Sequence, residues 1–132
     1  MIITDKTELS GENMNFQVLP STNRDIAVVT GSFCINTLDD ALELIANISY
    51  QTGCDGLVLE QKHLHPDFFD LKTGFAGQIL QKFTTYNMRL GIVGDFSAIN
   101  SKSFNDFMYE SNKKRKIVFV DTAAKAIEIL SA

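Results

Sequence analysis

The sequence predicts an α/β domain in the order β-β-α-β-α-β-α-β-α, with a mostly parallel five-stranded sheet and an antiparallel N-terminal edge strand. Short apolar runs alternate with stretches in which apolar residues recur at helical spacing, which is typical of α/β proteins. Only a short turn separates the first two predicted strands, and this favours an antiparallel hairpin. Helix-length segments separate the later strands, and such segments form right-handed crossovers between parallel strands.

Length and composition favour one domain of ordinary globular character. The chain has 132 residues, of which 45% are hydrophobic and 21% charged. A chain of this size buries enough surface to form a core without disulfide or metal support. We find no internal repeat or linker, so we expect residues 1–12 to be a loosely ordered leader and residues 13–132 to form a single domain.

The expected hairpin pairs Phe16–Leu19 with Ile26–Thr30. In the first strand, apolar residues alternate with Gln17, which indicates a half-exposed strand. The segment Pro20–Asn23 between the strands has the composition of a turn. Three further strands, Leu57–Glu60, Leu90–Val93 and Ile117–Val120, are short apolar runs that suit burial on both faces of a parallel sheet.

Four amphipathic helices are expected to cover this sheet. The first is capped by Asn36 or Thr37 and ends at Gly53, a residue that suits the left-handed C-terminal position. The second begins near Thr73, the third at Ser101 or Ser103, and the last at Asp121 or Thr122. The residues expected to face the core are, helix by helix, Leu38, Ala41, Leu42, Ile45 and Ile48; Phe75, Ala76, Ile79, Leu80 and Phe83; Phe104, Phe107 and Met108; and Ala123, Ile127 and Leu130.

The charge balance disfavours nucleic acid and anionic lipid as partners. There are 12 basic and 16 acidic residues, which give a formal net charge of −4. The basic run Lys113–Lys116 is expected to be a solvated loop that enters a strand, because no interleaved aromatic residues accompany it. We expect no membrane contact, no cofactor and a cytoplasmic location, while homo-oligomerisation stays open.

The two cysteines, Cys34 and Cys54, are expected to be free, buried thiols. They lie twenty residues apart without the spacing of a redox or zinc motif. In a cytosolic chain, thiols of this kind remain reduced. A nucleophilic role for Cys34 is disfavoured because activation of a thiol needs a nearby base or cation, and neither histidine lies near Cys34 in the sequence.

Any ligand or partner site is expected at the carboxyl ends of the parallel strands, as in other open α/β sheets. Two segments follow strands there, Gln61–Gly74 and Gly94–Ser97, and we expect them to be neighbours. The segment Asp70–Gly77 carries the clearest local signal. Its glycines permit close backbone approach to an anion at a helix start, or serve only to pack this helix on the sheet.

Residues with catalytic or metal-binding chemistry also occur in these segments. Glu60, His63, His65 and Asp67 have suitable atom types for zinc or manganese, but no further ligand is recognisable, and two surface histidines are the favoured interpretation. Asp70 and Asp95 could act as paired carboxylates. Such aspartates more often accept hydrogen bonds from backbone amides in turns, and we favour that role.

Several stretches resemble a bacterial family called domain of unknown function 4180. They are Pro66–Phe83, Val93–Ser97 and Phe107–Asn112, and the similarity extends over nearly all of the chain from about Asn15. The resemblance implies no established activity. Residues 1–12 look like an extension outside the family's usual pattern.

The strand order also resembles the STAS fold of the SpoIIAA-like anti-sigma-factor antagonists. In its regulatory members, a serine or threonine directly before a glycine at the start of the second helix is phosphorylated to control partner binding. The counterpart here is Thr73, which precedes Gly74, although Lys72 stands where a hydroxyl residue is expected and Asp70 lies one position too far upstream. Phosphorylation at this helix start is expected to be mildly favourable and to leave the fold intact.

Two hypotheses of different class follow. The first is a non-enzymatic regulatory module that binds an unknown protein partner or a small anion. Its expected site residues are Phe69, Asp70, Lys72, Thr73, Gly74, Asp95 and Ser97. The alternative is a small metal-binding protein or enzyme that uses His63, His65, Asp70 and Asp95. We favour the first, because an enzyme should show a more coherent set of titratable groups.

Overall fold

The chain forms one five-stranded sheet, in which four strands are parallel and one edge strand is antiparallel. The structure is a computed structural model that describes residues 14–20 and 23–132. The strands are β1 (Met14–Leu19), β2 (Ile26–Gly31), β3 (Gly56–Glu60), β4 (Arg89–Val93) and β5 (Ile117–Val120), and they lie side by side in that order. The leader expected over residues 1–12 lies outside the described residues.

The strand directions confirm the predicted topology. β1 pairs antiparallel with β2, with Phe16 opposite Val29, whereas β2 to β5 are all parallel. Residues directly opposite each other in the parallel pair β3–β4 include Glu60 and Val93. The segments that follow these two strands therefore leave the sheet at the same edge.

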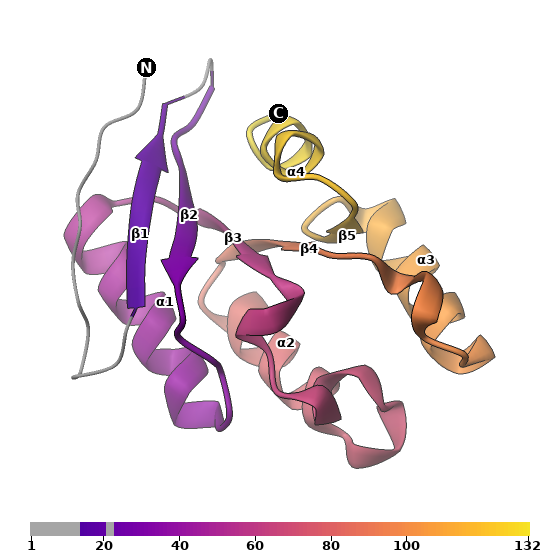
Figure 1. Cartoon of the computed structure of the whole chain (residues 1–132). Helices are drawn as coiled ribbons and strands as arrows, with labels where there is room; N and C mark the ends of the chain where they lie inside the picture. Colours follow the sequence, from indigo (N-terminus) through magenta and orange to yellow (C-terminus); the bar gives the residue numbers. More distant parts are fainter. Residues whose placement is uncertain (1–13, 21–22) are drawn as a thin grey trace.

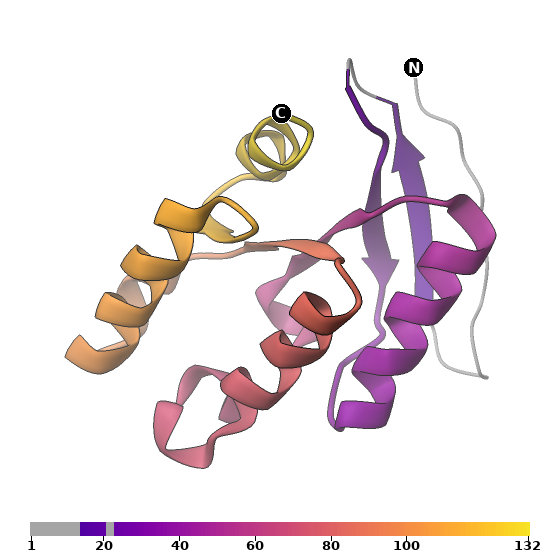
Figure 2. The same cartoon turned by 180° about the vertical axis from the view of Figure 1, so that it is seen from behind.

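The helices lie unevenly on the two faces of the sheet. They are α1 (Leu38–Thr52), α2 (Phe75–Thr85), α3 (Lys102–Lys114) and α4 (Ala123–Leu130). α1, α2 and α3 lie on one face, and α4 alone lies on the other (Figures 1 and 2). None of the helices in the described part of the chain combines the length and the apolar character needed to cross a bilayer.

The helix ends follow the local sequence closely. Thr37 caps α1 in a capping box with Asp40, and Gly53 ends it with a φ of 73°. Ser101 caps α3 and Thr122 caps α4 through their hydroxyl oxygens. α2 begins at Phe75, slightly later than expected near Thr73, because the preceding residues form a 3-10 turn.

Two apolar clusters hold the layers together. The larger one lies between the sheet and α1 to α3, and its largest fully buried side chains include four phenylalanines. The smaller one joins the sheet to α4. These phenylalanines are Phe16, Phe68, Phe83 and Phe104, and the buried residues of the smaller cluster are Ile26, Val58, Val118, Ala126 and Leu130.

Two details of the predicted helix faces were wrong. Leu44 of α1 is fully buried but was not among the expected core residues, whereas Leu42 is only partly buried. In α4, Ala126 faces the sheet and Ala123 is exposed. α4 packs so closely that a Cβ at Gly91 would lie 2.8 Å from the Cβ of Ala126. A contact of this kind between distant segments cannot be inferred from helical periodicity alone.

Candidate functional site

The segments that follow β3 and β4 meet at one edge of the sheet, as expected; we call this edge the carboxyl pole. The ring centroids of Phe69 and Phe96, one from each segment, lie 6.2 Å apart. Gly94 lies so close to Gln61 that a Cβ there would be 2.6 Å from the Gln61 Oε1 atom. A side chain at Gly94 would therefore meet that of Gln61, which shows how closely the two segments approach.

The long segment after β3 is built from three short 3-10 turns, Gln61–His63, Pro66–Phe69 and Leu71–Thr73. Phe68 anchors the middle turn, because its side chain is fully buried and its ring lies 6.5 Å from that of Phe104. Phe69 is only partly buried, and its ring lies 5.7 Å from the Phe104 ring. The apolar anchor holds the polar residues of the segment in fixed positions at the carboxyl pole.

His63 is a structural residue. Its side chain is fully buried, its Nδ1 accepts a hydrogen bond from the Glu60 amide at 3.0 Å, and its Nε2 lies 3.1 Å from the carbonyl oxygen of Gly31. These contacts require the neutral tautomer that carries hydrogen on Nε2. Burial lowers the pKa of His63, although the Gly31 carbonyl opposes that shift. The sequence-based interpretation of His63 as a surface residue was wrong.

His65 lies two residues further along the chain, and its side chain makes contacts that are separate from those of His63. Its Nδ1 accepts a hydrogen bond from the Asp67 amide at 3.0 Å, and its ring contacts Phe75 edge-on with centroids 6.2 Å apart. Over residues 14–20 and 23–132, no three His, Cys, Asp or Glu side chains gather closely enough to hold a metal ion. With both ring nitrogens of His63 bound to backbone groups, the described residues do not support the metal-site alternative.

Asp70 and Asp95 have the turn roles that we favoured. Each carboxylate accepts a hydrogen bond from the backbone amide two residues later, Lys72 in one case and Ser97 in the other, both at 3.1 Å. The Ser97 hydroxyl donates a second bond to Asp95 at 2.6 Å. The hydrogen bonds from Ser97, first that of its hydroxyl and then that of its amide, lower the pKa of Asp95.

Thr73 joins three backbone groups at the start of α2. Its hydroxyl lies 2.7 Å from the Asp67 carbonyl oxygen and 2.8 Å from that of Asp70, and it accepts a hydrogen bond from the Phe75 amide at 3.1 Å. Thr73 is nevertheless exposed, and Gly74 beside it has a φ of 75°. The hydroxyl thus connects two of the 3-10 turns to the first amide of the helix.

The family assignment rests on a direct comparison. A model of the family described as "Domain of unknown function (DUF4180)" matches residues 21–130. The chain belongs to the DUF4180 family. This confirms the resemblance seen in the sequence, whereas the similarity to the STAS fold extends only to a mixed sheet with helices in the same order. A search of curated proteins found no match.

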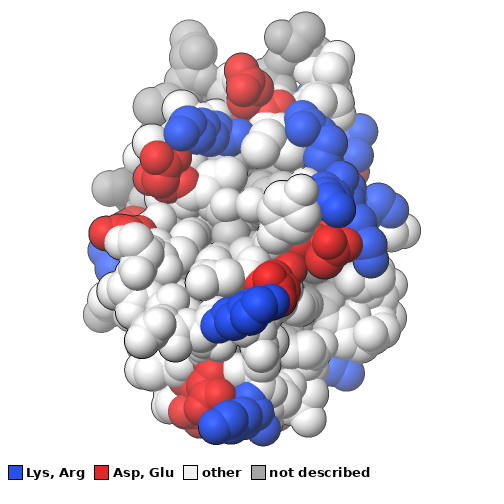
Figure 3. Space-filling view, turned by 90° about the vertical axis from the view of Figure 1, so that its right-hand side faces the viewer, with Lys and Arg blue, Asp and Glu red and all other residues white. Residues whose placement is uncertain are grey.

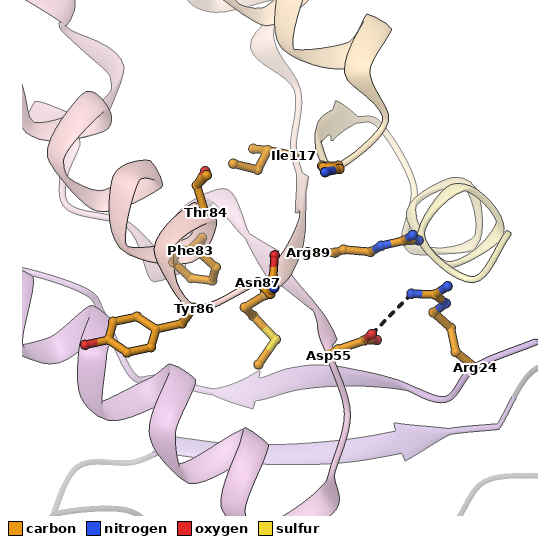
Figure 4. Close-up of a pocket in the computed structure, with 10 residues that line it drawn as sticks. Arg24, Asp55, Phe83, Thr84, Tyr86, Asn87, Arg89 and Ile117 are labelled. Carbon is orange, nitrogen blue, oxygen red and sulfur yellow. Dashed lines mark hydrogen bonds and ion pairs between the residues drawn. The ribbon is translucent and has the colours of Figure 1, made fainter.

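This DUF4180 domain has a second feature at the opposite end of the sheet, which the sequence analysis did not single out. A cleft of about 380 Å³ lies where β3, β4 and β5 begin, and we call it the amino-pole cleft (Figure 4). Arg24 donates to Asp55 at 3.2 Å, while Nη1 of Arg89 donates to the Leu130 carbonyl at 2.6 Å. Arg89 extends from β4 toward α4 in this view, and Lys116 also lines the cleft.

A topological signal for this cleft was present in the sequence. Arg89 and Lys116 directly precede two of the predicted parallel strands, and Asp55 lies two residues before a third. Parallel strands begin at a common edge of the sheet, so the three charged side chains are expected to lie near one another there. The rule that ligands bind where parallel strands end points to the opposite edge of the sheet and does not predict this cleft.

Proposed function

We propose that this DUF4180 domain is a non-enzymatic regulatory module that binds a protein partner at the carboxyl pole. The surface comprises Phe69, Asp70, Lys72, Thr73, Gly74, Asp95 and Ser97. The observation that carries the proposal is the position of Thr73, an exposed residue whose hydroxyl connects the backbone of Asp67, Asp70 and Phe75. A change at this one hydroxyl would alter the shape of the surface that a partner meets.

The charges of the pole favour a protein partner over a free small anion. The exposed Lys72 and the first amides of α2 attract negative charge. The carboxylates of Asp70 and Asp95 oppose that attraction for any anion small enough to contact both segments. A protein surface can instead place an acidic group near Lys72 and an apolar group on the partly buried Phe69.

Phosphorylation of Thr73 is proposed as the means of control. The phosphorylated side chain would lose its hydroxyl hydrogen and would set negative oxygens against the carbonyls of Asp67 and Asp70. Losing the donated hydrogen bond costs about 0.5–1.5 kcal/mol before this repulsion is counted, whereas the helix end contributes about 0.3–1 kcal/mol in favour. These contacts revise the sequence-based expectation, because the loop before α2 should rearrange.

The test compares four proteins in a quantitative pull-down from host lysate: wild type, Thr73→Ser, Thr73→Val and Thr73→Glu. Serine retains the hydroxyl, valine keeps the side-chain shape without it, and glutamate adds negative charge. We expect wild type and Thr73→Ser to recover the same proteins, and Thr73→Glu to recover a different set or amount. Equal recovery by all four proteins would exclude a role for Thr73 in partner binding.

A second measurement tests the modification itself. Protein isolated from its native host is digested, and the peptide that contains Thr73 is examined by mass spectrometry for a phosphoryl group. Metal analysis of the same untagged sample addresses the alternative function, because a metalloprotein that used His63 and His65 would carry stoichiometric transition metal. We expect a phosphorylated fraction and only trace metal.

A further inference from the structure

We propose that the amino-pole cleft binds a small molecule that has an anionic group and an apolar, ring-sized body. The cleft lies at the end of the sheet opposite Thr73, so this inference is independent of the proposed partner surface. It is lined by cationic side chains on one part of its wall and by apolar side chains on another. A ligand with both chemistries would complement both parts.

The charge in the cleft contrasts with the acidity of the whole chain. Arg24, Arg89 and Lys116 contribute three positive charges and Asp55 one negative charge, which leaves a surplus of two, although the chain has a net charge of −4. The carboxyl-terminal ends of α2, α3 and α4 lie at this end of the sheet, and each adds roughly half a negative charge. The balance at the cleft is therefore only slightly positive.

The remaining basic residues of the same end of the molecule reinforce this field. Lys113 and Lys114 occupy the last turn of α3, where Lys113 pairs with Glu110 at 3.3 Å, and Arg115 follows the helix. Figure 3 shows Lys and Arg side chains gathered at the upper right of this face, whereas elsewhere on it basic and acidic side chains stand side by side. Such a field raises the local concentration of small anions.

The geometry of the donors suits a carboxylate or a phosphate monoester. Arg89 uses Nη1 for the Leu130 carbonyl, and a guanidinium has further N–H donors. Lys116 is exposed at the rim and presents an ammonium group on a flexible stem. Arg89 is only partly exposed and its guanidinium donates a hydrogen bond to α4, so its remaining N–H groups have a fixed position. The ammonium group of Lys116 can instead move to contact the ligand.

The apolar part of the wall explains why the ligand should carry a body and not only a charge. The apolar surface open to a ligand comes from Tyr86, whose exposed fraction is 58%, and from the partly buried Ile117, while Phe83 and Met88 adjoin the cleft but are buried. A volume of about 380 Å³ is at the small end of the range for ligand pockets. A single ring with one anionic substituent matches that size.

Phenyl phosphate is the probe, and inorganic phosphate and phenol, the two parts of this ester, are the comparison ligands. Each is titrated into the isotope-labelled full-length protein, and amide NMR shifts are followed. We expect saturable shifts at Asn87–Arg89 and Lys116–Ile117, with phenyl phosphate binding at least about fivefold more tightly than either part. Absence of saturable shifts at these amides would overturn the proposal, and so would equal binding of inorganic phosphate, because the apolar wall would then contribute nothing.

Lys116→Gln and Lys114→Gln form a matched pair of variants. Both remove one positive charge from the same end of the molecule, but Lys114 does not line the cleft. We expect Lys116→Gln to weaken phenyl phosphate binding by about fivefold, as for the loss of one close charge, and Lys114→Gln to change it by less than about twofold. Equal losses would show general electrostatic attraction without a site and would refute the proposal. The amide spectrum of each variant reports whether the fold is retained.

Discussion

Replacing His63 with alanine should destabilise the protein substantially, although nothing in the sequence marks this residue as part of the core. The fully buried ring joins the end of β3 to the end of β2 through the Glu60 amide and the Gly31 carbonyl. Its removal leaves a cavity and two backbone groups that only entering water can satisfy. We expect a loss of about 2–4 kcal/mol, which is a large fraction of the stability of an ordinary domain.

The same residue should make stability depend on pH. Burial lowers the pKa of His63 from its usual 6.5, so the unfolded chain binds a proton more readily than the folded one. The free energy of unfolding therefore rises with pH in this region. The contribution of His63 is fully present above about pH 6.5 and decreases as the pH falls toward its lower folded pKa, with a slope of at most about 1.4 kcal/mol per pH unit.

Urea unfolding of wild type, His63→Ala and His65→Ala between pH 5 and 8 tests both statements. His65 is the control, because it is a partly exposed histidine in the same segment with a single backbone contact at its Nδ1. We expect His65→Ala to cost about 1 kcal/mol or less and to keep the pH dependence, whereas His63→Ala loses much of it. If both variants unfold at the same urea concentration, the account of His63 as a structural link between β2 and β3 is wrong.

Three further predictions concern packing, capping and thiol reactivity. Gly91→Ala should destabilise by about 1–3 kcal/mol because its Cβ would overlap α4, whereas Gly77→Ala, which has open space around it within α2, should stabilise by up to about 1 kcal/mol in urea unfolding. Thr73→Val should lower stability by about 0.5–2 kcal/mol and Thr73→Ser by less, measured in the same way, because only serine retains the hydroxyl that accepts from the Phe75 amide; equal losses would contradict that role. Cys54 is buried as expected, but Cys34 is only partly buried, which corrects the expectation that both thiols are buried. Thiol titration without reductant should find both free after denaturation and slow to react in the native protein at pH 7, because removal from solvent, in full or in part, raises the pKa of each thiol; fewer than two reactive thiols after denaturation would contradict this.

Much of the fold was determined by local sequence. Helical periodicity and the residues at the helix ends placed α1, α3 and α4, because capping by Thr37, Ser101 and Thr122 depends only on neighbouring backbone groups. Chain connectivity determined the strand directions, since helix-length crossovers leave few arrangements other than parallel strands. The adjacency of the two segments at the carboxyl pole followed from the same rule.

The tertiary structure decided the environment of individual side chains. His63 looked like a surface residue because its two hydrogen-bond partners are backbone groups, one of them 32 positions away at Gly31, and backbone groups leave no signature in the side-chain pattern. The burial of Ala126, and not Ala123, depends on how closely α4 approaches Gly91. The basic lining of the amino-pole cleft arises because Arg24, Arg89 and Lys116, far apart in the chain, are brought together where the strands begin. Periodicity specifies which residues share a face of a helix or strand, but contacts between distant elements depend on packing distances that only the folded chain establishes.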